Sequence, residues 1–318
     1  MLLVKRREFL AGAAALALAP DALARSVGGV STALVTADLE SHVVAVDLTT
    51  GRVLRRIRTG PGPRAIERFG NDALVAHTEH GLLTVIDGMR MRVRRTIEGF
   101  VEPRYAATWG SYFAFVTDSA MGQLVAVEVP TGRIIDRVEL GGAPRHLSLE
   151  PTGRVVWVVL GNSADRVAVV DVAQPSRMRL VRRFAPPFLA HDVGFGPGRV
   201  WLTGGASREV AVYDPHGHVV RLRADAAPQH VAFLGRLAVV ASGDSGTLRA
   251  HDARSGRLLR MSRVPLGSYN VDRAGPVGHV VTPSLSQGTL CVADRTGRVV
   301  RRVRVARSSH DACVVVTP

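Results

Sequence analysis

The chain has 318 residues, of which 46% are hydrophobic, and a formal net charge of +14 at pH 7. This length is ample for one large core, and no linker or low-complexity tract interrupts it. The two cysteines lack the C-x-x-C spacing of a zinc site, which excludes a cysteine-based metal fold.

The first 24 residues predict a targeting segment. Lys5-Arg6-Arg7 forms a basic start, and the apolar run Phe9–Ala19 is too short to span a bilayer as an ordinary transmembrane helix. Ala22-Leu23-Ala24 fits a cleavage site, and Arg6-Arg7-Glu8-Phe9-Leu10 resembles the twin-arginine signal. That signal implies export of the folded chain to the periplasm or the medium, with residues 25–30 as a short linker. An ordinary secretion signal is the alternative, and no lipid or transmembrane anchor is expected.

The segment Gly142–Phe184 predicts one unit of four short strands. Its second strand, Arg154–Leu160, is an apolar run rich in β-branched residues, as in buried strands. A four-stranded antiparallel meander of this size is too small to be stable alone. The predicted strands are Arg145–Glu150, Arg154–Leu160, Arg166–Val172 and Arg177–Phe184.

This unit recurs along the chain about every 40 residues, and two sequence features mark each copy. The first strand of each unit starts just after a Pro or its substitute, at Arg64, Arg104, Arg145, His191, Gln229, Tyr269 and His310. An acidic residue ends each third strand, at Asp47, Asp87, Glu128, Asp171, Asp214, Asp252 and Asp294. Four strands per period of about 40 residues indicate β-propeller blades. Residues 31–318 are therefore predicted to form an all-β, seven-bladed propeller.

The two ends of this region predict how the ring closes. It opens on a second strand, Ser31–Ala37, and finishes on a first strand, Asp311–Thr317. We expect the C-terminal strand to complete the blade of the N-terminal strands, because pairing them removes two unpaired sheet edges.

Arginines concentrate on the predicted outer strands, where charge discourages pairing between sheet edges. The alternative is a basic girdle that holds the protein at an anionic envelope polymer or lipid surface, or near other exported proteins. Nucleic acid is not an expected partner, because the chain is predicted to be exported and has no recognisable nucleic-acid module. We expect a monomer. The arginines are Arg55, Arg56, Arg58, Arg92, Arg94, Arg95, Arg179, Arg182, Arg183, Arg221, Arg223, Arg301, Arg302 and Arg304.

Cys291 and Cys313 fall on the third strand of the seventh blade and the first strand of its neighbour. An even pair in an oxidising compartment invites a disulfide. The alternative is two separate buried thiols, because bridging requires Cα atoms within about 7 Å.

The start of each inner strand faces the central channel of a propeller, so the seven starts above form a first ring. The next residues form a second ring: Ala65, Tyr105, His146, Asp192, His230, Asn270 and Asp311. Side chains of adjacent strand residues alternate, so we expect one ring to face the channel and the other the blade interfaces. The pattern leaves open which ring does so.

Three interpretations of these rings stay open. The first is structural, with polar side chains tying neighbouring blades together. The second is a funnel for a small anion, because Arg pairs with carboxylate or phosphate. Its candidate residues are the first ring: Arg64, Arg104, Arg145, His191, Gln229, Tyr269 and His310. The third is a divalent metal held by imidazole and carboxylate groups, with His146, Asp192, His230 and Asp311 as the main candidates and His191 and His310 as others. No other cofactor is expected.

The repeat resembles the bacterial YVTN-type, or YncE-like, seven-bladed propellers. The resemblance covers the mature chain and rests on Ala143-Pro144-Arg145-His146-Leu147, Glu150-Pro151-Thr152-Gly153-Arg154 and the Val-Val-Asp-Val at 169–172. It implies an exported binding scaffold without enzymatic chemistry.

Pro144-Arg145-His146-Leu147 also looks like the propeller lactonase family, in which an Arg and a His act with a nearby Glu. Here Leu160-Gly161-Asn162-Ser163 stands where that family has Asn-Glu. The resemblance implies a lactone-handling enzyme that uses Arg145 and His146, as the alternative to a non-enzymatic binding protein.

Overall fold

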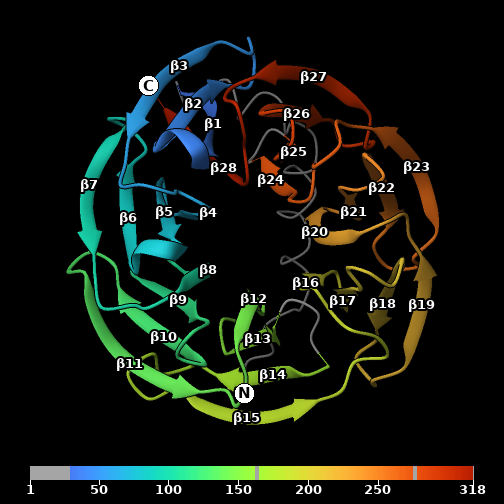
Figure 1. Cartoon of the computed structure of the whole chain (residues 1–318). Helices are drawn as coiled ribbons and strands as arrows, with labels where there is room; N and C mark the ends of the chain where they lie inside the picture. Colours follow the sequence, from blue (N-terminus) through green and yellow to red (C-terminus); the bar gives the residue numbers. More distant parts are fainter. Residues whose placement is uncertain (1–28, 162–164, 275–277, 318) are drawn as a thin grey trace, which may run out of the picture.

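Seven four-stranded antiparallel sheets surround a common axis (Figure 1). The computed structural model describes residues 29–161, 165–274 and 278–317, and the predicted targeting segment lies outside this range. Within it, helix is limited to two 3-10 turns, η1 (Asp38–Glu40) and η2 (Thr78–His80), and no helix is long and apolar enough to cross a membrane. The predicted seven-bladed, all-β fold is confirmed.

Each blade is a meander that runs from the axis outwards. The first blade contains β28 (Ala312–Thr317), β1 (Val30–Ala37), β2 (His42–Asp47) and β3 (Val53–Arg58). The second contains β4 (Ala65–Phe69), β5 (Asp72–His77), β6 (Leu82–Asp87) and β7 (Arg92–Ile97). The third contains β8 (Pro103–Trp109), β9 (Phe113–Asp118), β10 (Gln123–Glu128) and β11 (Arg133–Glu139). The fourth contains β12 (Pro144–Leu149), β13 (Val155–Leu160), β14 (Val167–Asp171) and β15 (Arg179–Phe184).

The remaining three blades follow the same order. The fifth contains β16 (Asp192–Gly196), β17 (Arg199–Thr203), β18 (Glu209–Tyr213) and β19 (Val219–Arg223). The sixth contains β20 (Pro228–Leu234), β21 (Leu237–Ser242), β22 (Thr247–Asp252) and β23 (Leu258–Arg263). The seventh contains β24 (Asp272–Ala274), β25 (His279–Pro283), β26 (Thr289–Ala293) and β27 (Val299–Arg304).

The ring closes through the first blade, as the ends of the chain predicted. Strand β28 pairs antiparallel with β1 from Val30↔Thr317 to Val35↔Ala312. The Thr32 and Thr317 hydroxyls lie 2.7 Å apart and share a hydrogen bond. The N- and C-terminal strands therefore share one sheet. On its two sides, β28 contacts β4 and β24, the inner strands of the neighbouring blades.

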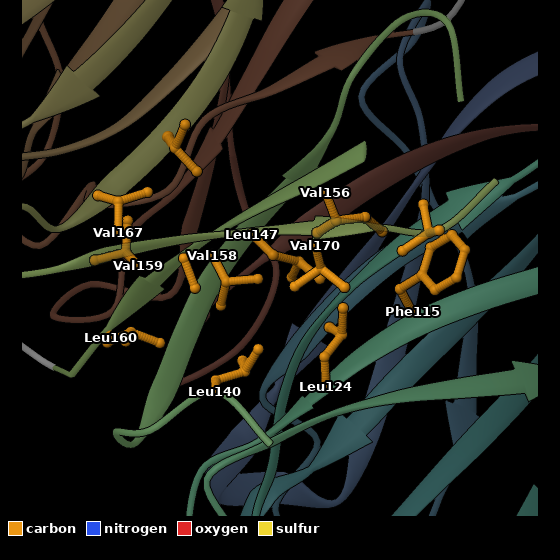
Figure 2. Close-up of a cluster of buried hydrophobic side chains, with 14 of the residues drawn as sticks. Phe115, Leu124, Leu140, Leu147, Val156, Val158, Val159, Leu160, Val167 and Val170 are labelled. Atoms are coloured by element: carbon orange, nitrogen blue, oxygen red, sulfur yellow. The ribbon is translucent and has the colours of Figure 1, made fainter. Parts of the chain in front are cut away.

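The hydrophobic core lies between the blades rather than at the axis. Second and third strands are buried on both faces because each sheet is covered by a neighbour on either side, which explains their continuous apolar runs. At the junction of the third and fourth blades, Phe115 and Leu124 pack with Leu147, Val156 and Val170 (Figure 2). Burying each such side chain stabilises the fold by about 1.5–3 kcal/mol.

The turn between third and outer strands explains the repeated acidic marker. The Asp47 carboxylate Oδ1 accepts hydrogen bonds from the backbone N–H groups of Thr49 (2.7 Å) and Thr50 (3.2 Å). Gly51 then takes a φ of +78° and donates its N–H to the Asp47 carbonyl at 2.7 Å. Such a turn combines an Asx anchor with a left-handed position that favours glycine.

Several rim arginines join neighbouring blades. From the seventh blade, Arg301 donates from Nη2 to the Thr49 carbonyl (2.6 Å) and from Nη1 to the Thr50 carbonyl (2.9 Å), both in the first blade. Arg55 in the first blade donates to the Arg90 carbonyl of the second at 3.3 Å. Arg95 in the second donates to the Thr131 carbonyl of the third. These outer-strand arginines therefore link neighbouring blades, a role that the sequence analysis did not predict.

Both cysteines are free, buried thiols. Cys291 on β26 packs in the cluster between the sixth and seventh blades, whereas Cys313 on β28 packs between the first and second. Burial raises the pKa of Cys291 to about 11 and raises the pKa of Cys313 well above its usual range. The structure therefore agrees with two separate buried thiols.

Candidate axial binding site

Two carboxylates at the starts of inner strands tie blades together. The Asp192 Oδ1 accepts the Val193 N–H at 2.8 Å, and its Oδ2 accepts the Val231 N–H of the next blade at 3.3 Å. Asp311 repeats this arrangement with the N–H groups of Ala312 (2.8 Å) and, in the next blade, Ile66 (3.0 Å). Both carboxylates, predicted as metal ligands, are engaged by backbone amides.

Threonine hydroxyls of the second strands form hydrogen bonds between blades that the sequence did not lead us to expect. The hydroxyl of Thr36 donates to the Arg64 carbonyl of the next blade at 2.9 Å, and that of Thr117 donates to the Arg145 carbonyl at 2.7 Å. Thr203 does the same to the Gln229 carbonyl. The signal in the sequence was a Thr near the end of the second strand, in Val-Thr-Ala, Val-Thr-Asp and Leu-Thr-Gly.

Irregular pairing at the inner strands mixes the two predicted rings. Register shifts lie between Pro103 and Ala106 in β8, between Pro144 and Leu147 in β12, and between Pro228 and His230 in β20. An extra residue in one strand breaks strict alternation and redirects side chains. His191 of the first ring lies with His146 and His230 of the second, so the two predicted rings are not separate at these three positions.

Arg145 lies near the charges of Arg104 and Arg64, which start the inner strands of the two preceding blades. Burial lowers the pKa of Arg145, and the positive charges of Arg104 and Arg64 lower it further, while a hydrogen bond with Tyr105 opposes the shift. Arg104 is also ion-paired with Glu102. The three arginines of consecutive blades are thus close enough for their charges to interact.

The Tyr105 phenol lies between the guanidinium groups and the imidazoles. Its ring centroid is 3.9 Å from that of His146 and 5.8 Å from that of His230. Burial raises the pKa of Tyr105 to about 12, so its hydroxyl stays protonated at neutral pH. The sequence placed Tyr105 in the second ring without assigning it a role.

Three imidazoles from consecutive blades form a cluster of His146, His191 and His230. Their ring centroids are separated by 4.6 Å (His146–His191), 4.3 Å (His146–His230) and 5.8 Å (His191–His230). One ring nitrogen of each lies within 4.8 Å of the other two. Burial and the charges of the neighbouring His230 and His191 hold the pKa of His146 well below its usual range, so this imidazole is neutral.

The other members of the first ring do not join this cluster. Tyr269 donates its hydroxyl to Asp244 at 2.7 Å, and this bond raises the Tyr269 pKa to about 12. The His310 carbonyl accepts the Asn270 side-chain amide at 2.8 Å. Burial and the Arg64 charge hold the pKa of His310 well below its usual range, which places it beside the arginines.

A cluster of acidic residues that was not predicted from the sequence lies further along the inner strands. Glu67 and Asp272 each lie three residues after a ring start, and their charges interact with that of Asp311. Burial raises the pKa of Asp272 to about 7 and that of Asp311 to about 6, and raises the pKa of Glu67 well above its usual range. A cavity of about 30 Å³ between Glu67, Tyr105 and Asp311 has room for a water molecule.

A larger cavity lies away from the axis, in a groove between the fourth and fifth blades. Its volume is about 600 Å³, and its walls include Trp157, Phe184, Phe195 and Tyr213. The Arg182 guanidinium lies 5.8 Å from the Trp157 ring centroid and 5.2 Å from that of Phe184. Aromatic packing and cation–π contact account for these half-buried rings.

No family model matches the chain, and no curated protein is significantly similar in sequence. Solved structures do match it. A functionally unknown protein from Desulfotomaculum acetoxidans matches with a TM-score of 0.78 and 11% identity, over 89% of this chain and 98% of that one. A "putative 6-phosphogluconolactonase" from Bacteroides fragilis matches with a TM-score of 0.71 and 11% identity, over 91% and 99%.

A third match is the hydrazine synthase of Kuenenia stuttgartiensis, with a TM-score of 0.64 and 15% identity, over 80% of this chain and 95% of that one. At these identities the likeness concerns the fold alone, and unrelated functions share the propeller fold. The class shown is therefore a seven-bladed β-propeller, and the function has to be argued from the axial residues.

Proposed function

We propose that this protein is an exported, non-enzymatic binding propeller whose axial mouth takes a small carboxylate or phosphate anion. The observation that carries the proposal is the gathering of Arg64, Arg104 and Arg145 on consecutive blades, where Arg145 is partly desolvated beside the other two charges. Like charges held this close are unfavourable unless an anion offsets them.

The carboxylates near these arginines have partners of their own. Glu102 pairs with Arg104, while Asp192 and Asp311 are directed to backbone amides of the next blade. The guanidinium groups and the protonated Tyr105 hydroxyl, which is hydrogen-bonded to Arg145, are hydrogen-bond donors near one another. Convergent donors of this kind suit a carboxylate or phosphate, which guanidinium groups bind with two parallel hydrogen bonds.

The lactonase alternative has less support. Arg145 and His146 are adjacent, but His146 is 1% exposed. A general base must come within hydrogen-bond reach of its substrate, so a lactone would reach this imidazole only after the mouth rearranged.

Thermal melting in the presence of acetate, citrate and phosphate, at constant ionic strength, tests the anion proposal. We expect at least one anion to raise the melting temperature of the wild type, because a ligand that binds only the folded state stabilises it. Arg64→Ala and Arg104→Ala should weaken this shift while the blades stay folded.

The matched control is Arg304→Ala, which removes the same charge from the exposed outer strand β27. It should keep the anion-dependent shift of the wild type. Destabilisation by Arg64→Ala or Arg104→Ala, together with a wild type whose melting no anion changes, would show that the three arginines are structural.

A further inference from the structure

The cluster of His146, His191 and His230 has a geometry that anion binding does not require. The three imidazoles come from the inner-strand starts of the fourth, fifth and sixth blades, so separate sheets position them independently. His146 and His191 are 1% and 6% exposed, and the His230 side chain is 12% exposed. Two buried imidazoles and one half-buried imidazole thus lie against one another.

Their spacing is close to that of a coordination sphere. Nitrogens around a tetrahedral ion with bonds of about 2.1 Å are about 3.4 Å apart. Here one nitrogen of each ring lies within 4.8 Å of the others. Side-chain rotations that bring the nitrogens closer by about 1.4 Å or less would complete the sphere.

His146 supplies an independent observation that a ligand is expected. Its Nε2 is buried and has no hydrogen-bond partner among the residues that the structure describes. A buried polar atom without a partner destabilises the fold, and a metal ion would occupy its lone pair.

Asp192 lies beside the third imidazole. The His230 Nδ1 lies 3.4 Å from Asp192 Oδ2, and backbone amides of two blades fix this carboxylate. A carboxylate that accepts one ring N–H directs the other nitrogen of the imidazole towards a metal and raises its basicity. Asp311 makes the same backbone bonds, yet among the described residues no imidazole is ion-paired with it.

We propose that His146, His191 and His230 bind one divalent first-row transition-metal ion at the axial mouth. Imidazole ligands favour Zn²⁺, Cu²⁺, Ni²⁺ or Co²⁺ over Mg²⁺ and Ca²⁺, which prefer oxygen. Three protein ligands leave one position open to an exogenous ligand. Imidazole ligands carry no negative charge to offset that of the ion, so the exogenous ligand would be anionic.

The test is a titration of metal-free, full-length mature protein with Co²⁺ and Zn²⁺, in a buffer without coordinating anions. Calorimetry gives the stoichiometry, and the visible spectrum of Co²⁺ reports coordination number. We expect one ion per chain and a four- or five-coordinate spectrum in the wild type. His191→Gln and His230→Gln should each weaken binding by more than about 100-fold, because outer-shell partners alone are worth about 10- to 100-fold.

The control is the double variant His216→Ala, His218→Ala. It removes two exposed imidazoles between β18 and β19, whose ring centroids are 6.3 Å apart. It should bind the ion as the wild type does. Circular dichroism confirms that each variant is folded, and His146→Gln adds a third variant if one of the others is not. A wild type that binds no ion, or glutamine variants with unchanged affinity, would overturn the proposal. Anion binding by metal-free protein is measured separately, so either proposal can fail alone.

Discussion

At the scale of single residues, the acidic residue after each third strand anchors a turn. Asp252 is a clear case, because its Oδ1 accepts the Ser255 N–H at 2.8 Å, the Arg254 N–H at 3.2 Å and the Ser255 hydroxyl at 2.9 Å. These bonds, first of all that from the Ser255 backbone, lower the pKa of Asp252 to about 2. The turn is thus more stable when this carboxyl is ionised.

The resulting prediction concerns Asp252→Ala. A carboxyl whose pKa is lower in the folded state than its usual 3.8 adds stability above that value, and this stability is lost as the pH falls towards 2. Asp252→Ala should therefore melt below the wild type at pH 6, and the difference should shrink as the pH falls from 5 to 2.5. Thermal melting followed by circular dichroism measures both.

Asp252→Asn is the matched control, because it keeps an acceptor for the turn amides and removes the charge. It should lose only the part of the stability that depends on pH. A difference between wild type and Asp252→Ala that stays the same over the whole pH range would contradict the role of the ionised carboxylate.

At the scale of elements, the outer strands do more than carry charge. Arg301 on β27 reaches across the junction of the seventh and first blades to the Thr49 and Thr50 carbonyls. Its side chain also lies against Gly51, where an added Cβ would come within 3.1 Å of the Arg301 Cδ and Nη1. The guanidinium thus joins the two blades that close the ring at its outer edge.

We predict that Arg301→Ala lowers the free energy of unfolding by about 1 kcal/mol, because two charge-assisted hydrogen bonds at a partly exposed site are lost. In a domain of this size that is a fall of about 2 °C in melting temperature. Arg304→Ala, on the same strand, removes an equal charge from an exposed position and should leave the melting temperature nearly unchanged. Equal effects of the two substitutions would show that charge, not the blade contact, sets stability.

The sequence predicts the blades of this protein but not the arrangement of its axial side chains. Three features of the fold were predicted from the sequence: the first residue of each inner strand, the acidic residue in each turn, and the blade shared by the two ends of the chain. They follow from the alternation of side chains, from turn chemistry and from the pairing of sheet edges. The axial cluster does not, because the register shifts in β8, β12 and β20 override alternation. The shifts in β12 and β20 lie at His146 and His230, and these two side chains meet His191, whose neighbouring strand β16 pairs regularly. Glu67 and Asp272 were not predicted, because the sequence around them does not distinguish them from exposed acidic residues of a strand. Each lies three residues after the first residue of its inner strand.

At the scale of the whole molecule, stability depends on closing the ring. Each sheet covers its neighbours, so a gap at one junction exposes two faces at once. The C-terminal strand fills that position with Cys313, Val314 and Val315, all at most 2% exposed, and Asp311 ties it to the second blade. Burial of a Val-sized side chain is worth about 1.5–3 kcal/mol, whereas a domain has a net stability of about 5–15 kcal/mol. Losing this one strand therefore removes much of the net stability.

We predict that deleting residues 311–317 abolishes the single cooperative melting transition, because β1 becomes an unpaired inner edge and two blade interfaces lose their packing. The control is a circular permutant in which a short turn joins Thr317 to Val30, paired neighbours in the sheet, and new ends open at the exposed Gly141–Gly142 loop. That permutant keeps every strand and contains only whole blades, so it should still melt in one transition. Calorimetry compares the two chains with the parent. A deletion variant that melts sharply near the parent temperature would show that the C-terminal strand does not close the ring energetically.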